Sequence, residues 1–198
     1  MSAPPKTVLT ATSDEADAIR RAVRELAARI GVRLEHAPGL ARLLADPRVS
    51  DPIYDIPRPI TEETVSRWVA ESIAAGERGE CLMTVTLDEA GEVAGYSRIV
   101  VWPDRASAEI AGAKRADRQN SGSGGAGVAQ ATALMFETLG VRLIGLTAAL
   151  DNIRSAKAID AAGYVRMGER ESVRPDGSIR RSLYWELTRD AWRRMRRA

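Results

Sequence analysis

A glycine-rich stretch between a strand pattern and a helix pattern constrains the fold more than any other feature of this sequence. It runs from Gln119 to Gly127 and reads QNSGSGGAG. A short apolar run, 108–113, precedes it, and apolar residues at helical spacing follow it from Val128 to Leu139. A strand, exposed backbone N–H groups and a helix N-terminus can together hold an anion, because small residues admit a phosphate and the helix dipole favours negative charge. The stretch therefore predicts a phosphate-binding loop.

The composition bounds the class of protein. The 198 residues fit one domain with a sizeable core, and 44% hydrophobic with 28% charged residues is ordinary for a globular protein. A formal net charge of +2 gives no indication of nucleic acid or membrane as a partner. A single cysteine, Cys81, and a single histidine, His36, predict neither a disulfide nor a metal site. Without a signal-peptide pattern or a membrane-spanning run, the expected location is the cytoplasm.

Helical patterns dominate the first 80 residues. They predict a helix over 13–31, a short strand over 32–36, a short helix over 40–44 and a helix from Thr61 to about Gly76. Residues 46–59 carry four prolines and predict an irregular, extended loop. A loop of that length often serves as a binding loop or lid.

Strand patterns follow from Cys81 onward. Expected strands cover 81–87, 92–102, 106–114, 141–147, 164–173 and 178–187, with helices after the glycine loop, after Asp151 and at 190–197. The order β-β-β-α-β-α-β-β predicts an α/β (α+β) fold with a mixed, mostly antiparallel sheet flanked by helices. A crossover helix should join the third strand to the fourth.

Two motifs in this order resemble a known family. Residues 119–124, QNSGSG, fit the pattern Gln/Arg-x-x-Gly-x-Gly/Ala directly after a strand and at the start of a helix. The chain thereby resembles the GCN5-related N-acetyltransferase (GNAT) superfamily. Downstream, Asn152, Ser155 and Gly163-Tyr164 are similar to the Asn-x-x-Ser…Gly-Phe signature of the branch that includes ribosomal-protein N-terminal acetyltransferases. The resemblance implies a GNAT-like sheet in a domain over 32–198, preceded by an N-terminal helical extension over 1–31.

The resemblance also implies acetyl-CoA as co-substrate and direct acetyl transfer to a primary amine, on a protein or peptide N-terminus or a small molecule. The residues implied to contact CoA are Ala113, Lys114, Gln119, Asn120, Ser121, Gly122, Ser123, Gly124, Gly125 and Asn152. The pantetheine arm would lie where the strands ending near Lys114 and Thr147 splay apart. The acceptor cleft should be lined by the 46–59 loop, the following helix and the last hairpin, where acidic groups such as Glu169 would suit a cationic acceptor.

Three residues are candidates for catalysis. Glu109 could serve as the base, directly or through a water, or could be a strand-end carboxylate paired with an arginine. Ser155 could protonate the departing thiolate, or could satisfy a backbone group in the first helical turn. Strand alternation puts Glu169 on the same face as Val165 and Met167, which would line a cleft, unless the strand is an edge strand whose alternation slips at Gly168.

Other functions compete for the same loop. Residues 122–127 satisfy G-x-G-x-x-G, the dinucleotide fingerprint, but that fingerprint needs a buried apolar strand immediately before it, and residues 115–121 are polar. The alternatives are therefore a catalytically silent CoA-binding or interaction module and, behind it, an NAD(P)-binding oxidoreductase. Neither a membrane nor a nucleic acid is expected as a partner. The sequence does not decide whether the protein forms a homodimer.

Overall fold

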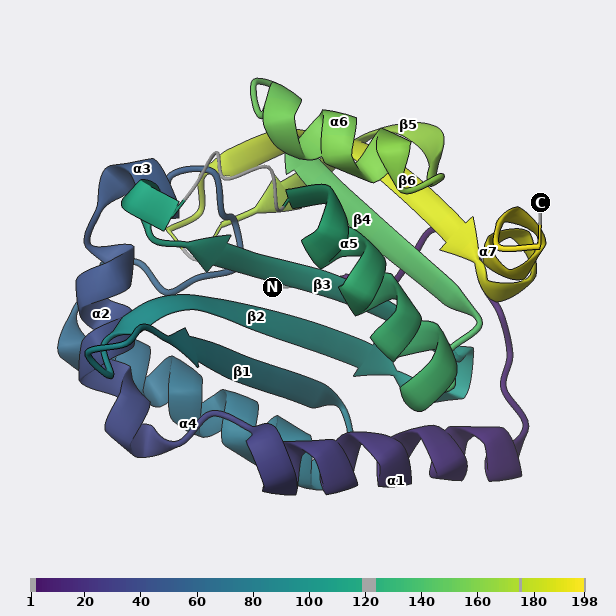
Figure 1. Ribbon diagram of the computed structural model, residues 1–198, viewed down its shortest axis with the longest axis horizontal. Helices are drawn as coiled ribbons and strands as arrows, with labels where there is room; N and C mark the ends of the chain where they lie inside the picture. Colours follow the sequence, from purple (N-terminus) through teal and green to yellow (C-terminus); the bar gives the residue numbers. More distant parts are fainter. Residues whose placement is uncertain (1–2, 119–123, 175, 198) are drawn as a thin grey trace.

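Six strands form one sheet that carries helices on both faces (Figure 1). The computed structural model describes residues 3–118, 124–174 and 176–197. The strands, in the order β1-β2-β3-β4-β6-β5 across the sheet, are β1 Cys81–Leu87, β2 Val93–Trp102, β3 Ser107–Lys114, β4 Leu143–Ala149, β5 Val165–Val173 and β6 Ile179–Thr188. Neighbouring strands are antiparallel except β3 and β4, which are parallel. The predicted mixed, mostly antiparallel sheet is confirmed.

Seven α-helices cover the sheet within the described residues. They are α1 Ser13–Ile30, α2 Ala37–Leu44, α3 Pro47–Ser50, α4 Glu62–Arg78, α5 Gly124–Ala133, α6 Ile153–Ala161 and α7 Arg189–Met195. A π-helical turn, Leu134–Thr138, continues α5. Because α5 crosses from the end of β3 to the start of β4, those two strands can run parallel, as the predicted crossover helix requires.

Two core clusters show which helices cover which face. In one cluster, side chains of α1, α6 and α7 pack with those of the π-helical turn and with Leu82 and Ile99 of the sheet. In the other, side chains of α2 and α4 pack with Met83 and Tyr96. The neighbouring residues Leu82 and Met83 of β1 therefore point to opposite helical layers. In Figure 1, α1 and α5 lie toward the viewer and α4 lies farther away.

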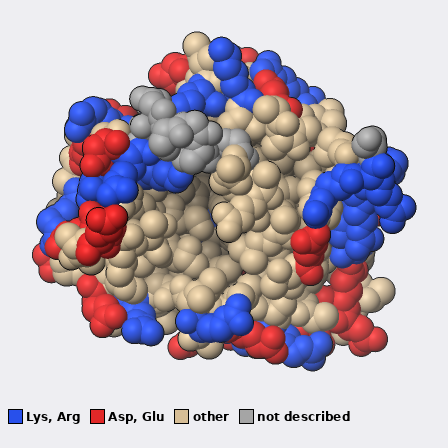
Figure 2. Space-filling view, in the orientation of Figure 1, with Lys and Arg blue, Asp and Glu red and all other residues tan. Residues whose placement is uncertain are grey.

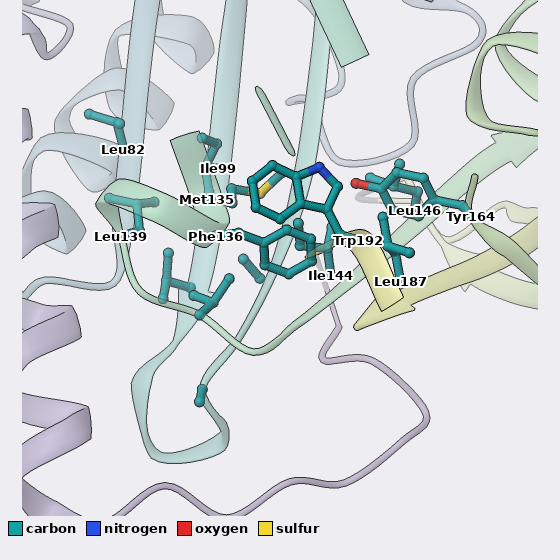
Figure 3. Packing of buried hydrophobic residues seen from close by; sticks show 14 of the residues in the cluster. Leu82, Ile99, Met135, Phe136, Leu139, Ile144, Leu146, Tyr164, Leu187 and Trp192 are labelled. Carbon is teal, nitrogen blue, oxygen red and sulfur yellow. The ribbon is translucent and has the colours of Figure 1, made fainter. Parts of the chain in front are cut away.

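Large aromatic side chains fill the first cluster (Figure 3). Phe136 of the π-helical turn meets Trp192 of α7 with ring centroids 5.3 Å apart. Burying one such side chain stabilises the fold by roughly 1.5–3 kcal/mol. The contact therefore ties the short C-terminal helix to the crossover segment.

Two local predictions are wrong. Residues 32–36 form no strand, because the His36 Nδ1 accepts the Arg33 N–H and turns Leu34–His36 into a 3₁₀ helix leading into α2. The proline loop is not wholly irregular: Asp46 caps α3, whose first residue is Pro47, a favoured helix start. The helix expected from Thr61 to about Gly76 is α4, which ends two residues later at Arg78, because Gly79 adopts the left-handed conformation with φ of 80°.

The N-terminal part packs closely onto the rest. Ile19, Val23 and Leu26 of α1 belong to the same core cluster as the sheet residues. The segment 3–7, here called the N-terminal strap, passes behind β4 before it reaches α1 (Figure 1). Its Thr7 backbone N–H donates to Glu186 of β6 over 2.9 Å. A domain boundary at residue 31 stays a prediction.

None of the described helices combines the length and the apolar character needed to cross a bilayer.

Candidate active site

The parallel strands β3 and β4 pair over only three residues. Ser107–Glu109 pair with Leu143–Gly145, and the pairing stops there. Beyond this point β3 pairs only with β2, up to Lys114, and β4 only with β6, up to Ala149. The two strands therefore splay, as the sequence predicted for the strands ending near Lys114 and Thr147.

A cavity of about 680 Å³ occupies this splay. Its lining comes from both faces of the sheet. On the face of α5 and α6 it is lined by Val128, Ala131, Thr132, Leu146, Asn152, Ser155 and Tyr164; on the opposite face by Val49, Ile53, Tyr54, Asp55, Glu109 and Arg180. Figure 2 shows the surface hollowed beside the N-terminal end of α5, among residues that are mostly uncharged.

The α5 side of the cavity has the features expected for a CoA site. Ala113 and Lys114 of β3 line it, and Gly124 and Gly125 begin α5. Among the described residues, no atom lies within 4 Å of a Cβ added to Gly127, so this wall is open to a ligand. The predicted contacts Gln119, Asn120, Ser121, Gly122 and Ser123 lie outside the described residues.

Asn152 and Ser155 lie together at the start of α6. The Asn152 side chain caps the helix by accepting the Ser155 backbone N–H over 3.1 Å. Ser155 is half-buried, and both residues line the cavity. Beside them, the hydroxyls of Tyr164 and Thr132 are 2.7 Å apart and join the end of α6 to α5.

Glu109 is buried in the splay, with only 5% of its surface exposed. The Tyr54 hydroxyl lies 3.0 and 2.9 Å from its two carboxylate oxygens. The pKa of Glu109 is raised to about 7, mainly by burial and also by the nearby charge of Asp55, although the Tyr54 hydrogen bond and the charges of Arg170 and Arg180 lower it. Among the described residues Glu109 forms no ion pair, so it is not the arginine-paired carboxylate that was the alternative.

Asp55 beside it is neutralised. Its carboxylate pairs with Arg98 over 3.3 Å, and the Arg98 Nε also lies 3.3 Å from the Ser72 hydroxyl. Both charged side chains are largely buried, with exposures of 2% and 17%. The pair therefore adds little net charge to the cavity.

Arg180 of β6 also lines the cavity and is 7% exposed. Its guanidinium stacks 5.2 Å from the centroid of the Tyr54 ring. Its Nε has no hydrogen-bond partner, and no described carboxylate forms an ion pair with it. Burial lowers its pKa.

Glu169 lies elsewhere. It is exposed on the edge strand β5, where its carboxylate pairs with Arg181 over 2.6 Å. The register shifts between Arg166 and Glu169, where Gly168 has φ of 92°, so the alternation slips as the alternative reading expected. Glu169 does not line the cavity, and we give it no catalytic role.

The sequence reasoning did not single out Tyr54, Asp55 or Arg180. For the first two there was an indirect signal, because they lie in the proline loop that was expected to bind. For Arg180 the signal was the alternation of polar residues at 180, 182, 184 and 186, which places them on one face of β6. The expected contribution of the following helix is absent, since no residue of α4 is among those lining the cavity.

A family model decides the classification. The Acetyltransferase (GNAT) domain matches residues 30–165, which is more than half of the chain. The chain belongs to the GNAT acetyltransferase family. This assignment supports an acetyl-CoA-dependent acetyltransferase over an NAD(P)-dependent oxidoreductase. A search of curated proteins finds no match.

Solved structures share the GNAT fold. The ribosomal-protein-S5-alanine acetyltransferase from Vibrio fischeri is 16% identical with a TM-score of 0.69, covering 83% of this chain and 93% of that one. RimJ from Mycobacterium smegmatis, in complex with CoA-disulfide, is 21% identical with a TM-score of 0.67, covering 84% and 86%. Aminoglycoside acetyltransferase AAC(6')-Ib, in complex with coenzyme A and kanamycin, is 23% identical with a TM-score of 0.65, covering 85% and 97%.

As a GNAT acetyltransferase, the chain uses acetyl-CoA as co-substrate, and the α5 side of the cavity fits it. The unpaired stretches of β3 and β4 leave backbone groups for an amide-rich arm, and the open wall at Gly127 allows close approach. The start of α5 offers N–H groups and a positive dipole end to a phosphate.

Proposed function

We propose that this GNAT enzyme transfers an acetyl group directly from acetyl-CoA to a primary amine, with Glu109 as the general base. The observation that carries the proposal is the environment of Glu109: a buried carboxylate with a pKa of about 7, in the gap between two splayed strands. A general base works best when its pKa lies near the operating pH, and a primary ammonium must lose a proton before it can attack.

The arrangement gives each substrate its own side of the sheet. Acetyl-CoA, which supplies the acetyl group as a thioester, would be held by the α5 side: the backbone from Ala113 to Lys114, the start of α5, and Asn152. The amine would enter on the side of Tyr54 and Arg180. Glu109 lies on this same side, next to the gap between the strands, and would accept the ammonium proton there.

Two further groups complete the proposed chemistry. A backbone N–H near Ala113 or Lys114 would donate to the carbonyl oxygen as negative charge develops on it. Ser155 lines the cavity at the start of α6 and would donate a proton to the thiolate. Tyr54 would hold the Glu109 carboxylate in place through its hydroxyl.

Amine acceptors occur among proteins of this fold. Structures with the same fold include an aminoglycoside acetyltransferase in complex with kanamycin, a ribosomal-protein-S5-alanine acetyltransferase and a spermidine N-acetyltransferase. They support an amine as the acceptor class, and both a protein N-terminus and a small molecule remain within it.

A thiol-release assay with acetyl-CoA over a panel of peptides, amino acids and polyamines tests the proposal. Wild-type protein should release CoA with at least one amine, and Glu109→Gln should lower kcat by about 10²–10⁴-fold, the usual contribution of a general base. Glu137→Gln is the matched control, because Glu137 is exposed and pairs with Arg196 on the surface. CoA binding without release for any amine would instead identify a catalytically silent module.

A further inference from the structure

The acceptor side of the cavity contains a buried cation, Arg180, that forms no ion pair with a described carboxylate. Arg180 is more than nine-tenths buried, lines the cavity, and has an Nε without a hydrogen-bond partner in the part of the chain that the structure describes. Arg181, the next residue, is by contrast exposed and paired with Glu169. Burying an unpaired charge is costly, so such a group normally has a ligand or an ion-pair partner.

The neighbouring acids do not supply that partner. Asp55 is already paired with Arg98. Glu109 holds the Tyr54 hydroxyl and attracts Arg180 only across a longer distance. The positive charge of Arg180 therefore remains available to a group that enters the cavity.

Tyr54 links this cation to the proposed base. Its ring stacks against the Arg180 guanidinium, and its hydroxyl bonds to Glu109. Arg180, which can bind an anion, and Glu109, which can accept a proton from an ammonium group, therefore contact two parts of the same Tyr54 side chain. One small molecule with both groups would satisfy both sites.

We infer that Arg180 binds a carboxylate of the acceptor, so that the enzyme acetylates a small amine that carries a carboxylate, as a free amino acid does. This inference rests on the proposed function and names its substrate class. It replaces the cationic acceptor that the sequence suggested, because the residue that the last hairpin contributes to the cavity is Arg180 and not Glu169.

A carboxylate fits better than a phosphate. The guanidinium fork matches both groups, and Arg180 offers one positive charge. A phosphate monoester carries up to two negative charges. The ionised carboxylate of Glu109 nearby would repel the second charge. A polyamine would bring further positive charge next to Arg180 and bind less well.

The test compares matched acceptors. Free amino acids are assayed beside their carboxamides, their decarboxylated amines and phosphoethanolamine, in wild type, Arg180→Met, Arg180→Lys and the control Arg181→Met. Wild type should prefer an acid to its carboxamide in kcat/KM by about 10- to 100-fold, the range for a hydrogen-bonded charge. Arg180→Met should abolish this preference by lowering kcat/KM for the acid alone. Arg180→Lys should keep part of it, and Arg181→Met all of it.

Three results would overturn the inference: equal use of acid and carboxamide by wild type, an equal loss for both acceptors in Arg180→Met, or a preference for phosphoethanolamine. An equal loss would mean that Arg180 only supports Tyr54. Acetylation of uncarboxylated amines alone would reject this inference and leave the proposed function standing. If no amine is acetylated, the proposed function fails, and calorimetric binding of acid against carboxamide to the CoA complex still decides the role of Arg180.

Discussion

The hydroxyl of Tyr54 is within hydrogen-bond distance of both carboxylate oxygens of Glu109, at 3.0 and 2.9 Å. The two residues come from the proline loop and from β3, and both are almost fully buried. The loop therefore closes the acceptor side of the sheet and also sets the proton affinity of the proposed base.

Tyr54→Phe should move the acidic limb of the kcat/KM profile to higher pH. The hydrogen bond stabilises the ionised carboxylate, so its loss raises the pKa of Glu109 above its value of about 7. Tyr184→Phe is the matched control, because Tyr184 bonds to Glu186 away from the cavity and should leave the limb in place. A limb unmoved in Tyr54→Phe would mean that a different group titrates.

Asp55→Asn should move the same limb in the opposite direction. The negative charge of Asp55 raises the pKa of Glu109, so its removal lowers that pKa and extends activity to lower pH. The variant also leaves Arg98 without its buried partner, which typically destabilises a fold by about 3–5 kcal/mol. The pH profile is therefore measured below the melting temperature of the variant, and a shift to higher pH would contradict the assignment.

Glu109→Gln should stabilise the protein at alkaline pH while it impairs catalysis. Folding raises the pKa of Glu109 from 4.5 to about 7, so the native state binds the proton more tightly than the unfolded chain. Wild-type stability therefore falls as pH rises from 4.5 to 7, by up to about 3 kcal/mol at 1.36 kcal/mol per pKa unit. In denaturant unfolding, the variant should have a higher free energy of unfolding than wild type at pH 8 but not at pH 4. A gain of equal size at both pH values would exclude ionisation of Glu109 as its cause.

Gly127→Leu should weaken CoA binding without unfolding the protein. A Cβ at this position would meet no atom of the described residues within 4 Å, Gly127 lines the cavity, and leucine favours a helix over glycine by up to about 1 kcal/mol. The dissociation constant for CoA should rise at least tenfold, with a melting temperature equal to or above that of wild type. Ala126→Leu, on the exposed neighbour, serves as the control. Unchanged affinity would place CoA elsewhere.

Local patterns predicted most of the fold. Cys81–Leu87 and the capping of α4 by Thr61 were readable because alternation and capping depend on neighbours in sequence. The slip at Gly168 was left open, because either register satisfies the sequence until β5 pairs with β6. The 3₁₀ helix that ends at His36 was not predicted. There the Arg33 N–H donates to the His36 side chain, and not to the neighbouring strand that the pattern implied.

The only residues of the candidate site that were predicted are those that the resemblance to the GNAT superfamily implied. Glu109 and Asn152 were named from motif positions, and both line the cavity. Tyr54 is separated from Glu109 by 55 positions, and Asp55 from Arg98 by 43. Such contacts depend on how the loop folds over the sheet, and no spacing in one sequence encodes them.

The short pairing of β3 with β4 has a consequence for how fast the protein is degraded. The sheet lacks part of its own hydrogen bonding at its centre, and acetyl-CoA would supply it. A ligand that binds only the folded state adds about 2.7 kcal/mol at one hundred times its dissociation constant. Degradation of the enzyme would then slow when acetyl-CoA is plentiful, so that its abundance follows the supply of its donor, and protease resistance with and without CoA would measure that coupling.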